Sequence, residues 1–125
     1  CEQITAVNAL CYRAHCTHTT KALVQKLGLS EDKYLQSFQS RLGRERWLEP
    51  YTSELLKQLA AQGIKKVLVV CPAFTVDCLE TLHEIAQEYA EEYIHAGGEI
   101  LHKVPCVNDN DDWASGILQI IQDNG

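Results

Sequence analysis

Apolar and polar positions follow two different periods along the chain, and this pattern predicts alternating strands and helices. The stretch "KKVLVVCP" is continuously apolar between lysines and a proline, which is typical of a parallel strand buried on both faces. "KYLQSFQS" and "EILHKVPC" predict two further strands. Helices are predicted over 20–27, 52–63, 75–96 and 111–121, where apolar residues recur at helical spacing between capping residues and glycines.

After the first helix, the predicted elements follow the order β-α-β-α-β-α. This order indicates an α/β fold with a parallel sheet, helices on both faces and right-handed crossovers. We expect residues 1–125 to form a single Rossmann-like domain, with an irregular, cysteine-containing segment over 1–16. Three strands make a thin sheet, so we infer that a first strand, or a whole preceding domain, lies outside this chain.

Composition and charge remove several classes of function. The chain carries 17 acidic and 11 basic residues, a formal net charge of −6, whereas nucleic-acid binding needs a basic surface. There is no run of about 18 apolar residues that would predict a membrane span, and we expect no secretory signal, since "CEQITAVNAL" has neither a basic nor an apolar region of that kind. The six cysteines are interpreted as reduced thiols, which predicts a cytoplasmic protein without nucleic-acid partners.

The predicted helix 75–96 carries a row of acids at Glu80, Glu84 and Glu88, roughly opposite its apolar stripe. One interpretation is an ordinary solvated face. The other is a series of oxygen ligands about 6 Å apart, along which a cation passes from one carboxylate to the next. A π-bulge would align such acids better. We also expect Thr75 to cap this helix and Asp77 to lie in its first turn, and we interpret His83 as a surface residue.

Three stretches resemble ferrochelatases in order and spacing: "SFQSRLGRERWLEPYT", "VVCPAFTVDCLETLHEI" and "HAGGEILHKVPCVND". The resemblance covers nearly the whole chain and corresponds to the C-terminal half of the bacterial type. It implies a class II chelatase fold, in which two Rossmann-like halves enclose a cleft. It also implies insertion of Fe²⁺, as substrate, into protoporphyrin IX to give protohaem and two protons.

The resemblance also implies roles for individual residues. Glu80 would be the catalytic, metal-delivering carboxylate, and Glu84 and Glu88 would continue the row of metal ligands. Asp77 would be a carboxylate that supports these ligands without binding the metal itself. In "QSRLGRERW", Arg41 would meet a porphyrin propionate and Trp47 would pack near the macrocycle. For Trp47, burial between the two halves is an equally good interpretation.

The chain departs from the family pattern in one respect. The family's catalytic histidine belongs to a "Ser-x-His-Gly" motif on a strand before this chain begins, and neither His15 nor His18 fits that motif. We therefore expect the N-terminal half to be a partner that supplies this wall of the site, and the chain alone to be inactive. Cys78 stands where some members have a histidine, and is interpreted as a small apolar filler.

Cys1, Cys11 and Cys16 raise a second possibility. Some ferrochelatases carry a [2Fe–2S] cluster, which needs four thiolate ligands. Here the fourth ligand would be Cys106 or a residue upstream of the chain. The alternatives are reduced structural thiols or adventitious zinc.

Three other functions stay open at this point. The enzyme could act on coproporphyrin, or it could be a cobalt chelatase for a related tetrapyrrole, although "DCLETL" and "GGE" favour ferrochelatase. The chain could also be a module that binds a metal or tetrapyrrole without chemistry. Because haem is hydrophobic, we expect the full enzyme to dock on a membrane surface.

Overall fold

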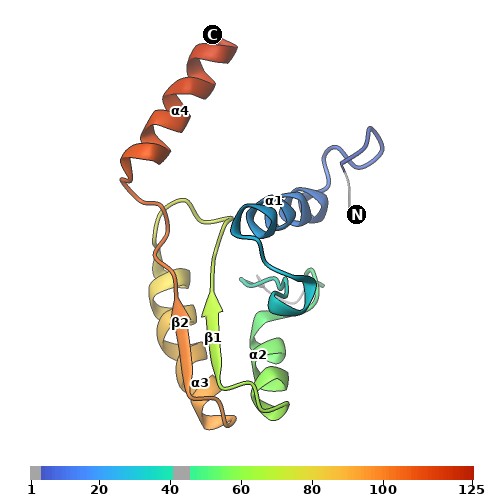
Figure 1. Ribbon diagram of the computed structural model, residues 1–125, viewed down its shortest axis with the longest axis vertical. Helices are drawn as coiled ribbons and strands as arrows, with labels where there is room; N and C mark the ends of the chain where they lie inside the picture. Colours follow the sequence, from blue (N-terminus) through green and yellow to red (C-terminus); the bar gives the residue numbers. More distant parts are fainter. Residues whose placement is uncertain (1–3, 41–45) are drawn as a thin grey trace. The chain divides into compact units, whose positions relative to one another are not determined.

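The computed structural model describes residues 4–40 and 46–125 of the chain (Figure 1). The chain divides into two compact units, Cys1–Leu59 and Ala60–Gly125. Within the described residues, no helix is both long enough and apolar enough to cross a membrane.

The first unit is built around helix α1, Tyr12–Leu27. The helix ends at Gly28, whose φ of 64° places it in the left-handed region that suits glycine. The amides of Gly28 and Leu29 donate to the carbonyls of Gln25 and Val24, which satisfies the last turn.

Helix α1 begins eight residues earlier than the predicted Thr20, so the predicted irregular segment 1–16 is wrong from Tyr12 onward. This first part of the helix buries one small side chain, Ala14, which is 1% exposed. Its neighbours are mostly polar and partly exposed. Because only one small residue is buried, large apolar residues do not recur at helical spacing there. The hydrophobic pattern therefore did not predict the first part of α1.

The strand predicted from "KYLQSFQS" is wrong except at one residue. Among the described residues of this stretch, only Phe38 pairs, in an isolated parallel bridge with Tyr51. The Phe38 amide donates to the Pro50 carbonyl at 2.9 Å, and the Thr52 amide donates to the Phe38 carbonyl at 3.1 Å. Pro50 has no amide hydrogen to extend a ladder, and Thr52 already starts helix α2, Thr52–Ala61.

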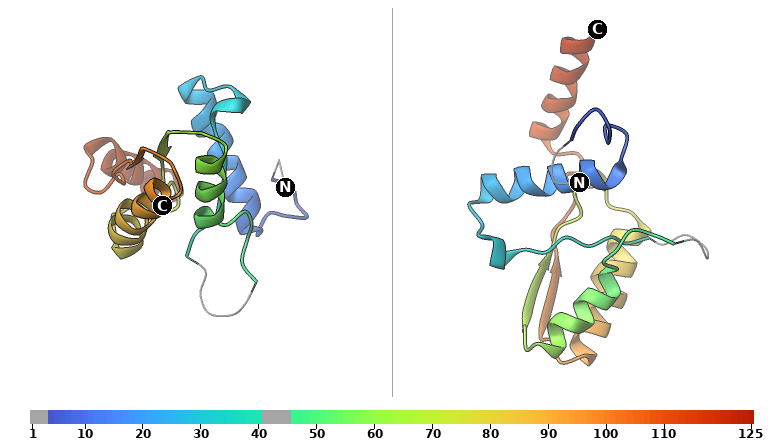
Figure 2. Two further views of the ribbon diagram at one scale, coloured as in Figure 1. Left: turned by 90° about the horizontal axis from the view of Figure 1, so that it is seen from below. Right: turned by 90° about the vertical axis from the view of Figure 1, so that its right-hand side faces the viewer.

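The second unit contains a two-stranded parallel sheet, which confirms the α/β class and the strand direction. Strand β1, Lys66–Val69, pairs with β2, Ile100–Lys103, in a register that places Lys66 opposite Ile100 and Val69 opposite Lys103. The helical connection between the strands packs along β2. Both views in Figure 2 show it beside the sheet.

This connection is π-helical over η2, Glu80–Tyr89, and α-helical over α3, Ala90–His95. The prediction of a start at Thr75 is therefore wrong by several residues. The Asp77 amide donates to the Asn108 side chain at 2.8 Å, and the Thr75 carbonyl accepts from the Asn108 amide at 2.9 Å. Because the backbone groups of Thr75 and Asp77 are hydrogen-bonded to Asn108 in the loop after β2, the helix begins only after Asp77.

The last helix, α4, runs over Asp111–Asn124, in agreement with the predicted start. Its N-cap is Asn110, whose side-chain oxygen accepts from the amides of Asp112 and Trp113 at 3.0 and 3.2 Å. A side-chain acceptor at this position satisfies amides that have no partner inside the helix.

Tyr93, which is fully buried, stabilises the turn between α3 and β2. Its hydroxyl donates to the Ile64 carbonyl at 2.7 Å, and its ring lies against Gly98, where a Cβ atom would overlap the ring carbons. Gly98 is therefore required for close contact with an aromatic ring.

We predict that Gly98→Ala lowers the free energy of unfolding by about 1–3 kcal/mol, because the added methyl group overpacks the site. Gly116→Ala is the matched control, since Gly116 lies inside α4 with open space around it. That change is expected to raise stability by about 0.5–1 kcal/mol. Thermal melting of both variants tests the account, and equal melting temperatures would contradict it.

Candidate active site

Asp77 is the centre of a hydrogen-bonded cluster at the carboxyl ends of the two strands. Its Oδ1 pairs with the Lys103 ammonium and accepts from the Thr81 hydroxyl at 3.0 Å. Its Oδ2 accepts from the Asn108 side chain at 3.0 Å and from the Cys106 amide at 3.2 Å. We call these five residues the Asp77 cluster.

The cluster keeps Asp77 ionised. The side chains of Lys103 and Asp77 are only 6% and 15% exposed. The Lys103 ammonium, followed by the Asn108 side chain, holds the pKa of Asp77 well below its ordinary value of 3.8. The ion pair and its hydrogen bonds thus tie the loop after β1 to the loop after β2.

The same cluster sets the start of the helix that carries the acids. Thr81 is fully buried, and its hydroxyl accepts from the Cys78 amide at 2.9 Å while donating to Asp77. The Cys78 carbonyl accepts from the Leu82 amide at 2.9 Å, which closes the first turn. Glu80 consequently lies in that turn, next to the ends of the strands.

Glu80 is partly exposed. Hydrogen bonding from Cys78 and from its own backbone lowers the pKa of Glu80. The carboxylate is therefore charged at neutral pH and suited to a cation.

The three acids predicted as a metal row line one hollow of about 460 Å³ together with Leu79 and His83. No three His, Cys, Asp or Glu side chains in the described part of the chain converge as metal ligands. The acids thus follow one another along the helix face instead of forming a closed cage.

Two contacts within this face span five residues. The Tyr89 hydroxyl donates to Glu84 Oε1 at 2.8 Å, and His83 Nδ1 lies 3.3 Å from Glu88 Oε1. Burial, followed by the Glu84 carboxylate, raises the pKa of Tyr89, so the hydroxyl stays protonated and donates. His83, interpreted from the sequence as a surface residue, is half exposed but contacts the row.

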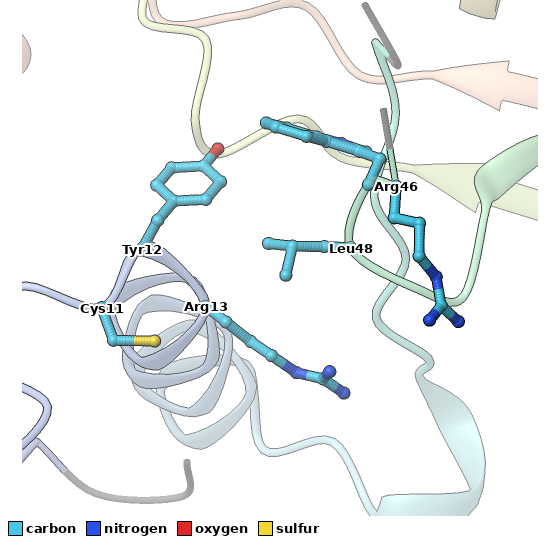
Figure 3. A pocket seen from close by; sticks show the side chains of 6 residues that line it. Cys11, Tyr12, Arg13, Arg46 and Leu48 are labelled. Carbon is cyan, nitrogen blue, oxygen red and sulfur yellow. The ribbon is translucent and has the colours of Figure 1, made fainter. Parts of the chain in front are cut away.

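Trp47, predicted to pack near the porphyrin, lies in the first unit. Trp47 is 39% exposed, and its indole nitrogen donates to the Gln39 carbonyl at 2.9 Å. Figure 3 shows the second hollow, with Tyr12 and Leu48 turned toward it. Arg41 lies outside the described residues. The hollow is lined by Cys11, Tyr12, Arg13, Arg46, Trp47 and Leu48.

The thiols predicted as cluster ligands do not form a four-thiolate set among the described residues. Cys11 and Cys16 are free thiols, and Cys1 lies outside the described range. The Cys106 amide belongs to the Asp77 cluster. Burial raises the pKa of Cys71 to about 11, so this thiol is neutral and fits the structural interpretation.

Several residues of the site were missed at the level of the sequence. Lys103 lies in a predicted strand, but the pattern of that strand did not show that its ammonium is nearly buried and paired with a carboxylate. Tyr89 gives no signal in the sequence, because a contact between residues five apart occurs in a π-helix and not at α-helical spacing. Tyr12 and Arg13 fell within the segment predicted to be irregular.

We predict that Asp77→Asn destabilises the protein at neutral pH, because Lys103 is left nearly buried without its carboxylate. The folded-state pKa of Asp77 is depressed, so its stabilisation is complete above about pH 5 and is lost as the pH falls below 3.8 toward the folded pKa. The melting temperatures of wild type and variant should therefore converge in acid.

Thermal melting between pH 7 and pH 2 measures this convergence. Asp109→Asn is the control, since it removes an exposed carboxylate from the loop after β2, the loop to which Asp77 is hydrogen-bonded, and should leave the melting temperature within about 1–2 °C of wild type. If the difference in melting temperature between Asp77→Asn and wild type stayed constant from pH 7 to pH 2, the stabilising role of ionised Asp77 would be refuted.

Comparison with known proteins identifies the family. The ferrochelatase family model matches residues 2–125. The ferrochelatase of Ectopseudomonas mendocina (strain ymp) is 51% identical over 112 residues, which is 90% of this chain and 33% of the relative. That of Azotobacter vinelandii (strain DJ / ATCC BAA-1303) is 50% identical over 119 residues, 95% of this chain and 35% of the relative. The chain spans about a third of the length of these relatives, and it belongs to the ferrochelatase family.

Proposed function

We propose that this chain provides the metal side of a ferrochelatase active site. The complete protein inserts Fe²⁺ into protoporphyrin IX and forms protohaem, the last step of haem biosynthesis. The observation that carries the proposal is the hollow in which Glu80, Glu84 and Glu88 line one face of η2, next to the Asp77 cluster at the strand ends. In parallel α/β sheets, this edge is where ligands bind.

The chemistry suits carboxylates at these positions. Fe²⁺ binds oxygen ligands while it remains partly hydrated, and successive carboxylates can each replace part of its water shell. Insertion replaces the two pyrrole protons of the porphyrin by the metal, so two protons must leave. Glu80, nearest the strand ends, delivers the metal and accepts a proton. Asp77 holds the helix start, and with it Glu80, in place.

The hollow of the first unit supports a porphyrin-binding role for Trp47, and Arg41 stays a candidate from the sequence alone. Trp47 shares its hollow with a tyrosine and two arginines, Tyr12, Arg13 and Arg46. Aromatic rings can pack on a macrocycle, and guanidinium groups can pair with propionates. Arg13 and Arg46 thus extend the set of propionate candidates beyond Arg41. The N-terminal half, with the family's catalytic histidine, supplies the opposite wall.

The name shared by the relatives supports iron over cobalt as the metal. We also propose protoporphyrin IX, rather than coproporphyrin, as the porphyrin substrate. The N-terminal half largely determines which porphyrin binds. No step is assigned to a [2Fe–2S] cluster, because the described thiols lack its ligand set. The cytoplasmic location and docking of the full enzyme on a membrane surface stay predictions from the sequence.

We predict that Glu80→Gln in the complete protein lowers kcat for Fe²⁺ insertion by at least about a hundredfold, because both a metal ligand and a proton acceptor are lost. Anaerobic assays that follow porphyrin fluorescence measure the rate. Glu54→Gln is the matched control, since Glu54 is an exposed acid in the first turn of α2 and lines neither hollow.

The control should keep the wild-type rate, and the chain without its N-terminal half should be inactive. If Glu80→Gln retained full activity, the acids would be an ordinary solvated face. If the complete wild-type protein bound metal or porphyrin but inserted nothing, the binding-module function would replace this proposal.

A further inference from the structure

The hydrogen bond between Tyr89 and Glu84 depends on the π-helical form of η2. In an α-helix, neighbours on one face are three or four residues apart, and residues five apart point in different directions. In a π-helix, the backbone bonds join residues five apart. The Tyr89 hydroxyl donates to Glu84 Oε1 at 2.8 Å across this spacing, so a helical register that is rare elsewhere makes the contact possible.

The two five-residue contacts on this face differ in environment. His83 and Glu88 are 54% and 55% exposed, so solvent screens their interaction. Tyr89 and Glu84 are part-buried, and a hydroxyl that donates to a carboxylate makes a strong, directional hydrogen bond. Of the two, the Tyr89–Glu84 bond therefore restrains its acid more tightly.

Glu84 is the middle acid of the row. It lines the hollow with Glu80 and Glu88, and its bond to Tyr89 engages one of its two carboxylate oxygens. A free glutamate side chain samples several rotamers. The hydrogen bond from Tyr89, one turn further along the helix, limits the rotamers of Glu84. The second carboxylate oxygen of Glu84 remains available as a metal ligand.

We propose that Tyr89 is a positioning residue for metal delivery, which holds Glu84 in the orientation needed to pass the cation from Glu88 toward Glu80. This inference rests on the proposed function and deepens it, since it names the group that orders the middle of the row. Tyr89 touches neither the metal nor the porphyrin in this role, and acts only through Glu84.

The test uses the complete protein with Tyr89→Phe, which removes the hydroxyl and keeps the ring. We expect the KM for Fe²⁺ to rise about tenfold, the effect of losing one hydrogen bond to a charged group. The kcat at saturating Fe²⁺ and the KM for the porphyrin should stay within about twofold of wild type. Titration calorimetry with Co²⁺ in the absence of porphyrin should show the same loss of affinity.

Two further variants separate positioning from structure. In a Glu84→Gln background, Tyr89→Phe should have little further effect on Co²⁺ affinity, because the two residues act as one unit. Tyr93→Phe removes a buried hydroxyl from the same helical connection, where it donates to Ile64. That control should lower the melting temperature and leave the KM for Fe²⁺ unchanged.

An unchanged Co²⁺ affinity in Tyr89→Phe, or an equal loss in both backgrounds, would overturn the inference. Its failure is distinct from failure of the proposed function. If Glu80→Gln is inactive while Tyr89→Phe has normal metal kinetics, only the role of Tyr89 is wrong. If the wild type inserts no metal, the Co²⁺ titrations still decide whether Tyr89 orients Glu84.

Discussion

The ion pair between Asp77 and Lys103 is the interaction on which the arrangement of the second unit depends. Lys103 is the last residue of β2, and Asp77 lies in the loop that follows β1. The pair therefore joins the ends of two strands that are more than twenty residues apart in sequence, and Thr81 and Asn108 complete it. Because the pair is nearly buried, loss of either partner leaves a charge that water cannot reach freely. The start of η2, and hence the position of Glu80, follows from this pair.

The π-helical register then restrains the middle acid of the row. An α-helix would already place Glu80, Glu84 and Glu88 within about 80° of one another, on one face. The three acids line one hollow, and the π-helical register adds the hydrogen bond from Tyr89 to Glu84, five residues apart. The resulting row is open to solvent and lacks a closed ligand set. Such a row suits a cation that must move on, whereas a resident metal needs several ligands around one point.

Part of this organisation could be predicted from the sequence. The apolar run "KKVLVVCP" predicted β1, because a short run of β-branched residues favours a strand. The predicted burial of this strand on both faces is wrong for the described chain, since Leu68 and Val70 are 64% and 51% exposed. The start of α4 followed from the polar residues before it. The acids at Glu80, Glu84 and Glu88 were placed on one face by simple periodicity. The rest depends on tertiary contacts. Ala14 alone gives α1 no periodic signal, and Pro50 ends the strand pairing at Phe38. The hydrogen bond between Asn108 and the Asp77 amide moves the start of the helix after β1 further along the chain. No local pattern encodes the π register that brings Tyr89 to Glu84.

The central claim is that the acidic row carries the metal to the porphyrin. Crystals of the complete protein soaked in Co²⁺ without porphyrin, with anomalous diffraction recorded at the cobalt edge, test it most directly. The account predicts cobalt in the hollow beside Glu80, Glu84 and Glu88, and a weaker peak there in Glu84→Gln. Cobalt bound elsewhere in an active enzyme, with none along this row, would contradict the account.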